Sequence, residues 1–286
     1  MISTLIPFVG AVALASGTIL QRFILKHKKV EIKSYQTLEF LAITIAIIPL
    51  LFFFWKMDSQ ALELKNILIF SLVILFSIAA NLFTFFSMKW EKISTLEPAK
   101  VLEPLFVILL AILFSFFFSQ KLYERNLKII IPALIAGLAL ILSHVKKRHL
   151  SFNKYFLAAI AGSFFFALEL VISRLILDFY SPISFYFVRC FAIFLISFVL
   201  FKPKIKQINK KLKLNIFLIG IIWVIYRVLI YYGYLNLGII FTTLIIMLGP
   251  IFIYLFAWKF LKEKPTWKNI LTALIIIACI LYTTLS

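Results

Sequence analysis

Charged side chains lie inside long apolar runs of this sequence, and each one requires a physical reason. Of the 286 residues, 64% are hydrophobic and only 14% are charged. A charge held at the centre of a bilayer costs at least ~2.5–3.5 kcal/mol on insertion scales, so it marks either a binding site or a structural ion pair. The main charged candidates inside the runs are Glu97, Lys100, Glu103, Glu169, Arg189 and Arg227.

Glu103 and Arg227 lie nearest the middle of their runs, which favours substrate binding for both. Glu103 is also the candidate for proton coupling, because burial beside apolar walls raises the pKa of a carboxyl toward the range in which it takes up and releases a proton. For Arg189 and Glu169 two alternatives stay open, substrate binding and structural pairing. The structural ion pairs considered are Glu169 with Arg227 and Glu103 with Arg189, each joining two helices.

Glu39, Glu97 and Lys100 lie closer to the ends of their runs, where a structural or interfacial role is favoured. Glu97, Lys100 and Glu103 step by three residues, so they share one broad helix face that must point at the protein interior. A proline directly follows each of the two glutamates in this run. Proline frees the carbonyl four residues earlier and kinks the helix, which is tolerated where a cavity or a neighbour satisfies the freed backbone.

Tyrosines surround Arg227 in the eighth run. Tyr226, Arg227, Ile230 and Tyr234 fall near a common helix face at three-to-four spacing. Aromatic hydroxyls beside a guanidinium suit a carboxylate or an aromatic zwitterion, because arginine is a bidentate partner for carboxylates. The alternative is an aromatic belt at the membrane interface. Asn81 aligns with Arg227 in the first half of the chain and adds a hydrogen-bonding candidate.

These residues together form one predicted substrate-binding set. Its members are Arg227, Glu103, Tyr226, Asn81, Arg189, Glu169 and Tyr234. The three histidines are scattered at the edges of loops, and both cysteines lie within apolar runs. We therefore expect no catalytic residue, no metal site and no cofactor.

The elements that position this set are ten apolar runs. A helix needs about 20 residues to cross ~30 Å of hydrocarbon. The mean hydropathy is +1.08, and the apolar fraction far exceeds the roughly 45–50% of soluble domains. We therefore predict an all-α polytopic membrane protein with ten transmembrane helices. The expected spans are 2–25, 35–55, 66–88, 94–118, 127–144, 154–177, 182–201, 214–236, 239–261 and 268–285.

The second five runs resemble the first five, which predicts two inverted five-helix repeats. Residues 21–25 align with 173–177, and Ser34 followed by Glu39 aligns with Ser184 followed by Arg189. Glu103-Pro104 aligns with Gly249-Pro250, and an asparagine opens the last run of each half. Bundles with an odd number of helices insert with opposite orientations, as in many secondary transporters. The expected repeats are 1–144 and 154–286, joined by a basic linker, 145–153.

The net charge of +19 sits mostly in loops beside the spans, so nucleic-acid binding is not expected. Loops after the odd-numbered runs, with their flanks, hold most of the lysines and arginines, and the opposite side holds few. By the positive-inside rule, the basic loops are cytoplasmic and both termini lie on the outer side of the membrane. We expect the protein to be a multi-pass protein of the cell membrane.

Short motifs in the second half resemble the EamA-type transporters of the drug/metabolite transporter superfamily. The run Ser173–Leu177 is followed by Ser181-Pro182 and Arg189, as at the start of the second repeat in that family. Gly249-Pro250, an apolar helix and then Lys262-Glu263-Lys264 are similar to its closing signature. The likeness extends over essentially the full length and is strongest from 156 to 285.

The resemblance implies ten helices in two inverted repeats around a central cavity that carries small metabolites, amino acids or drugs. It also implies cytoplasmic termini, opposite to the charge bias. The first half departs from the family pattern, with Glu39 in place of the usual arginine and Gln120-Lys121 in place of a Gly-Glu turn. Such motifs are short and lie on hydrophobic helices, so they identify the fold better than the substrate.

The favoured function is therefore secondary transport of a small metabolite by alternating access, with export as one direction. The substrate is an amino acid, another anionic or zwitterionic compound, or a drug-like molecule. No Walker motif for direct ATP drive is present. Two alternatives stay open: a lipid flippase or scramblase on the same fold, and, less favoured, a membrane-embedded lipid-modifying enzyme.

Overall fold

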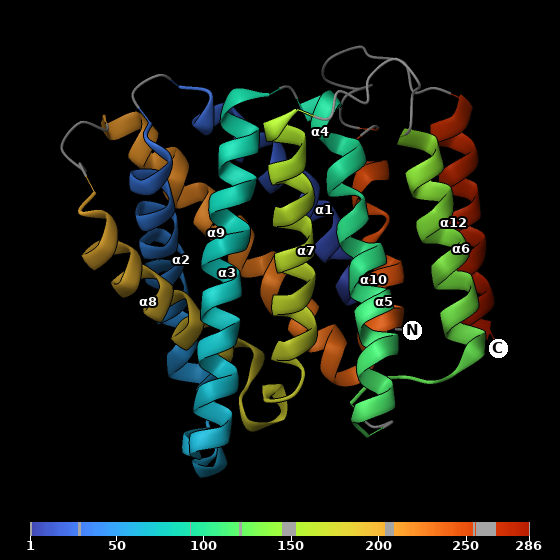
Figure 1. Ribbon diagram of the computed structural model, residues 1–286. Coiled ribbons are helices and arrows are strands. Elements are labelled where there is room, and N and C mark those ends of the chain that lie inside the picture. Colours follow the sequence, from blue (N-terminus) through green and yellow to red (C-terminus); the bar gives the residue numbers. More distant parts are fainter. Residues whose placement is uncertain are drawn as a thin grey trace.

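The structure of the chain is a computed structural model and describes residues 2–27, 30–91, 93–119, 122–144, 153–203, 209–253, 255 and 267–285. Within these ranges every long element is helical (Figure 1). The first-half helices are α1 (Ile2–Leu25), α2 (Ile32–Phe54), α3 (Leu64–Trp90), α4 (Ile93–Lys100), α5 (Leu102–Phe117) and α6 (Leu127–His144). The second-half helices are α7 (Lys154–Ser173), α8 (Pro182–Phe201), α9 (Lys210–Asn236), α10 (Ile239–Ile246) and α12 (Trp267–Leu285). Two short 3₁₀ turns, Ser59–Leu62 and Leu177–Phe179, lie in connections.

The predicted all-α fold with ten apolar helical stretches is confirmed within the described residues. Eight helical stretches are long and apolar enough to cross a membrane, and Leu127–Ser143 and Ile239–Ile253 form two shorter apolar helices. Most of the linker 145–153, Gln120-Lys121 and Lys262-Glu263-Lys264 fall outside the described residues.

Two predicted boundaries were wrong. The sixth span was expected to reach 177, but α7 ends at Ser173 because the next three N–H groups bond to carbonyls only three residues back, which tightens the chain into a turn. The eighth span was expected to begin at 214, but α9 begins at Lys210. The Asn209 side chain accepts a hydrogen bond from the Leu212 N–H (2.8 Å) and caps a first turn too polar to be counted as part of the apolar run.

The fourth and ninth spans are both interrupted, at matching places. The fourth breaks between Lys100 and Leu102, and the ninth breaks after Ile246, with helix resuming at 249–253. Pro104 and Pro250 lie four residues after Lys100 and Ile246, so the carbonyls of these two residues lack the N–H donor that would continue the helix. The kink expected from Pro104 is therefore present, and the aligned Pro250 accompanies a second one.

The helices pair across the two halves of the chain. α3 packs against α7, α1 against α9, α2 against α8, and α6 against α12, the last two pairs lying toward opposite edges of the bundle (Figure 1). In the predicted repeats, helices of one half have counterparts in the other half: α1 and α7, α2 and α8, α3 and α9, and α6 and α12. If counterparts are exchanged, the α1–α9 contact becomes the α7–α3 contact, and the α2–α8 and α6–α12 contacts stay the same. This is the pairing that two inverted repeats require, although the repeat itself stays a prediction.

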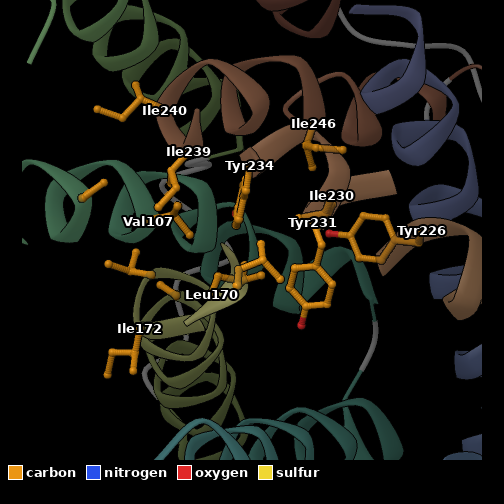
Figure 2. Packing of buried hydrophobic residues seen from close by; sticks show 14 of the residues in the cluster. Val107, Leu170, Ile172, Tyr226, Ile230, Tyr231, Tyr234, Ile239, Ile240 and Ile246 are labelled. Carbon is orange, nitrogen blue, oxygen red and sulfur yellow. The ribbon is translucent and has the colours of Figure 1, made fainter. Parts of the chain in front are cut away.

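Apolar packing fills the side of the bundle that faces the α9–α10 connection. Figure 2 shows Tyr234 among Val107 of α5, Leu170 of α7 and Ile239 and Ile240 of α10. All five side chains are buried. This core holds α5, α7, α9 and α10 together next to the charged residues described below.

Candidate functional site

A cavity of about 160 Å³ lies between the two halves, in the middle of the helix bundle. The cavity is thus well above the size that a single buried water needs. Its walls are mostly apolar and aromatic with a few charges, as in small-molecule sites. The lining residues are Leu14, Thr18, Gln21, Glu39, Phe40, Ile43, Asn81, Thr84, Phe85, Lys100, Val101, Glu103, Pro104, Ser163, Phe166, Tyr186, Arg189, Trp223, Tyr226, Arg227, Ile246, Pro250 and Ile253.

The two interrupted helices both face this cavity. Lys100 and Glu103 flank the first break, and Ile246 and Pro250 flank the second, and all four line the cavity wall. Irregular backbone at membrane depth is tolerated where it lines a cavity, and broken helices of this kind form binding sites in secondary transporters. The placement of the prolines thus positions Glu103 at the cavity.

A buried ion cluster forms one end of the site. The Glu169 carboxylate of α7 lies between two arginines: Oε1 is 3.2 Å from Arg189 NH1 of α8, and Oε2 is 3.1 Å from Arg227 NH1 of α9. Glu169 is fully buried, and both arginines are at least 93% buried. One negative charge therefore faces two positive charges, which leaves the cluster with an excess positive charge.

Hydrogen bonds to neutral hydroxyl groups hold Arg189 rigidly in this cluster. Arg189 donates from Nε to Ser77 Oγ of α3 (3.0 Å) and from NH1 to the Tyr231 hydroxyl (2.5 Å). Tyr231 in turn donates to Glu169 Oε1 (3.0 Å). Arg227 is held differently, because within the described part of the chain its NH1 contacts Glu169 without an aligned hydrogen bond. Arg227 is thus the less constrained of the two cations at the cavity wall.

Aromatic rings cover both guanidinium groups. The Arg227 guanidinium carbon lies 5.4 Å from the Phe166 ring centre and 5.8 Å from that of Tyr226, and the Arg189 carbon lies 5.5 Å from the Tyr186 ring centre. The negative ring faces stabilise cations in these positions. Glu103 lies within electrostatic reach of Arg227 and Lys100.

A second charged group, Glu39, lies in the same cavity wall. It is 2% exposed and stands on α2, seven residues from the start of that helix. Its Oε1 accepts hydrogen bonds from Gln21 Nε2 (2.9 Å), the Tyr35 hydroxyl (3.0 Å) and Trp223 Nε1 (2.8 Å). The three donors come from α1, α2 and α9, so both halves of the chain position this carboxylate.

The structure brings most of the predicted site residues together. Arg227, Glu103, Tyr226, Asn81 and Arg189 line the cavity. Asn81 also donates to the Ser77 carbonyl of its own helix (2.7 Å).

Glu169 and Tyr234 are placed differently from the other predicted residues. Glu169 lies behind Arg189 and Arg227 and pairs with both, so the Glu169–Arg227 ion pair considered from the sequence is present. The Glu103–Arg189 pair does not occur among the described ion pairs. Tyr234 lies in the apolar core of Figure 2 and not in the cavity wall. The side chain of Glu97 is outside the described part of the structure.

Four polar residues of the site were not in the predicted substrate-binding set. Glu39 and Lys100 line the cavity although both lie toward the ends of their spans, and Gln21 and Trp223 accompany Glu39. A signal for Glu39 was present, since its alignment with Arg189 puts an ionisable residue at the same position of both halves. In the described ranges, no group of three or more His, Cys, Asp or Glu side chains is arranged to hold a metal ion.

The side of the bundle that carries the α2–α3, α7–α8 and α9–α10 connections is closed by hydrogen bonds between the halves, and we call it the terminal side (lower in Figure 1). Met57 and Tyr180 form an antiparallel bridge. Ser181 Oγ donates to the Phe54 carbonyl (2.6 Å), and Lys56 N–H donates to Ser184 Oγ (2.8 Å). We call residues 54–58 and 179–184 the terminal clasp.

Glu124 makes a second contact between the halves on the terminal side. Its carboxylate accepts hydrogen bonds from the N–H groups of Ile239 (3.1 Å) and Ile240 (3.0 Å) at the start of α10. Burial raises the pKa of the Glu124 carboxyl, and these backbone bonds act in the opposite direction. Gly238 precedes the helix at φ 84°, and a side chain there would collide with Glu124, so this approach requires glycine.

Comparison with known proteins identifies the family of the second half of the chain. Residues 153–285 match the EamA-like transporter family. These residues belong to the EamA-like transporter family. The family is part of the drug/metabolite transporter superfamily, as the motifs predicted, and the matched range contains Glu169, Arg189 and Arg227 of the site.

Solved structures extend the likeness to the whole fold. One of them, titled only "Crystal structure of protein", superposes with a TM-score of 0.71 at 17% sequence identity and covers 99% of this chain and 96% of its own. In total 29 solved chains match. Comparison with curated protein sequences gave no significant match. The fold of that structure thus spans the whole chain, including the half in which Glu39 lies.

Proposed function

We propose that this EamA-family transporter is a secondary carrier for a small anionic or zwitterionic metabolite, such as an amino acid, and works by alternating access. The observation that supports this most is the cavity itself. It lies between the halves, is flanked by two interrupted helices and exposes Arg227 beside aromatic rings. Binding sites at the interface of repeats, formed by discontinuous helices, suit rocking of one half against the other.

Arg227 is the proposed partner of the anionic group. Its charge exceeds what Glu169 can neutralise, because Glu169 also pairs with Arg189. A substrate carboxylate supplies the missing negative charge and can take two parallel hydrogen bonds from a guanidinium. Tyr226 and Asn81 border the same space and add hydrogen-bonding groups.

Glu103 is the proposed site of proton coupling. It stands at the helix break, within reach of Arg227 and Lys100. A substrate anion bound at Arg227 changes the electrostatic environment of this carboxyl, so substrate and proton binding are linked. Under this proposal the terminal clasp opens when the opposite side closes.

The test is transport of radiolabelled amino acids and organic anions into liposomes that contain the purified protein. Arg227→Ala is expected to lower transport about ten- to a hundredfold, since a charge-assisted hydrogen bond contributes about 1.5–3 kcal/mol. Glu103→Gln is expected to remove the dependence on a proton gradient. Lys65→Ala and Glu63→Gln, which alter exposed charges outside the cavity, serve as matched controls.

Transport that neither Arg227→Ala nor Glu103→Gln affects would contradict the proposed site. Movement of labelled phospholipid in the same liposomes, without uptake of small metabolites, would favour the flippase alternative. The orientation needs its own test, because the charge bias places both termini outside and the family resemblance places them inside. A cytoplasm-dependent reporter fused after Ser286 distinguishes the two.

A further inference from the structure

Glu39 is a buried carboxylate whose neighbours satisfy its hydrogen bonds but not its charge. Its three hydrogen-bond donors among the described residues are neutral groups, and all three contact the same oxygen, Oε1. Within the described part of the chain, the ion pairs join Glu169 to Arg189 and Arg227 and Asp178 to Arg174, and none includes Glu39. A buried carboxylate without a cation is costly, so this one requires a partner that the described residues do not supply.

The position of Glu39 makes that partner a ligand. Its side chain borders the cavity, as do Phe40, Phe85 and Trp223, whose rings form an apolar and aromatic wall. Trp223 donates its N–H to Glu39, and its ring centre lies 5.5 Å from that of Tyr226. Carboxylates and aromatic faces together bind ammonium groups, because both present negative potential to the cation.

The residues that contact the negative and positive ends of the site lie close together on one helix. Trp223, which contacts Glu39, and Arg227, which contacts Glu169, are four residues apart on α9, and so about 6 Å apart along the helix axis. Glu39 and Arg189 occupy aligned positions in the two halves and have opposite charges. The two halves thus present a negative and a positive end to one cavity.

We infer that Glu39 binds the cationic group of the substrate, which is therefore an amino-acid-sized zwitterion with an ammonium group at Glu39 and an anionic group at Arg227. This rests on the proposed function and narrows it, since an anion without an ammonium group leaves Glu39 unpaired. Gln21, Tyr35 and Trp223 then act as positioning residues that fix the carboxylate toward the ligand.

The experiment uses three related probes: L-leucine, isocaproate, which lacks the ammonium group, and isoamylamine, which lacks the carboxylate. Binding of each to the purified protein is measured by calorimetry for the wild type, Glu39→Gln and Arg227→Ala. In the wild type, leucine is expected to bind at least tenfold more tightly than either analogue. Glu39→Gln should reduce the leucine-to-isocaproate ratio to about one and leave leucine-to-isoamylamine discrimination in place, and Arg227→Ala should do the reverse.

Two further variants separate a charge effect from a folding effect. Glu39→Asp keeps the charge and should retain discrimination against isocaproate at lower affinity. Glu124→Gln removes a carboxylate that also accepts three N–H hydrogen bonds but lies outside the cavity, so both affinity ratios should stay at the wild-type values. Thermal unfolding curves confirm that each variant is folded.

An unchanged leucine-to-isocaproate ratio in Glu39→Gln would overturn the inference, as would a wild type that prefers isocaproate or binds none of the three probes. The liposome assay distinguishes failure of the inferred role of Glu39 from failure of the proposed carrier function. Arg227-dependent uptake of simple anions, unaffected by Glu39→Gln, would refute the role of Glu39 alone. Absence of uptake for every anion and zwitterion would refute the carrier proposal itself.

Discussion

Glu169 is the residue on which the buried charge cluster depends. Its two carboxylate oxygens contact Arg189 and Arg227 separately, and Tyr231 and Ser173 donate further hydrogen bonds to Oε1 (3.0 and 3.3 Å). The three charged groups come from α7, α8 and α9, so the cluster also joins three helices of the second half. Removing the single anion leaves two cations buried side by side.

We expect Glu169→Gln to destabilise the protein by about 3–5 kcal/mol, the usual loss when a buried ion pair loses one member. Arg227→Ala should lower the free energy of unfolding much less, because Glu169 keeps its contacts with Arg189. Thermal unfolding in detergent, at matched protein and detergent concentrations, measures both. Adding Arg189→Met to Glu169→Gln should restore part of the loss by removing one of the two uncompensated charges. Equal destabilisation by Glu169→Gln and Arg227→Ala would contradict this account.

Among the helices, the two interrupted ones show most directly how local sequence shapes the site. Proline removes one helical hydrogen bond and clashes with the carbonyl four residues earlier, at a cost of about 3 kcal/mol or more in a helix interior. The chain bears this cost at Pro104 and Pro250, and both breaks face the cavity. α6 also contains a proline, Pro132, but runs unbroken from Leu127 to His144 and packs against α12 at the edge of the bundle.

Replacing both Pro104 and Pro250 by alanine is therefore expected to lower the transport rate at least tenfold without lowering thermal stability. The alanines restore N–H donors for the carbonyls of Lys100 and Ile246, so each interrupted helix can become continuous across the site. Pro132→Ala is the matched control and should leave transport within about twofold of the wild type. A double variant that transports at the wild-type rate would show that the breaks serve packing alone.

At the scale of the whole molecule, the structure is closed on its terminal side. The clasp joins the α2–α3 and α7–α8 connections by backbone hydrogen bonds, among them Asp58 N–H to the Phe179 carbonyl (2.8 Å) and Ser181 N–H to the Lys56 carbonyl (3.0 Å). These bonds flank Met57 and Tyr180, which face each other as a pair without mutual hydrogen bonds. Such pairs have Cα atoms about 4.5 Å apart, within the range of a disulfide.

A disulfide between Met57→Cys and Tyr180→Cys is therefore expected to hold the clasp closed. In a background with Cys190 and Cys279 replaced by alanine, oxidation should abolish transport, and reduction should restore it. The two single-cysteine variants show whether either substitution alone impairs transport. Full transport by the oxidised double variant would contradict opening of the halves at this side.

The sequence by itself determined the ten spans, because the length and hydropathy of a run are properties of that run and need no knowledge of its neighbours. It also indicated the break at Pro104, since proline acts on the carbonyl four residues before it, but a proline alone does not decide a break, because Pro132 lies in the unbroken α6. It identified most of the charges at the site, because an ionisable residue in an apolar run is costly wherever the helix packs.

Only the tertiary structure decided which of these charges share a cavity. Glu39 was expected to have a structural or interfacial role because it lies near a span end. The packing of α2 against α9 brings Trp223, 184 residues away in sequence, into hydrogen-bond contact with it. Tyr234 fell on the same helix face as Arg227, yet α10 covers it and places it in the core. The rotation of each helix about its axis depends on contacts between the two halves, and no local pattern in either half specifies those contacts.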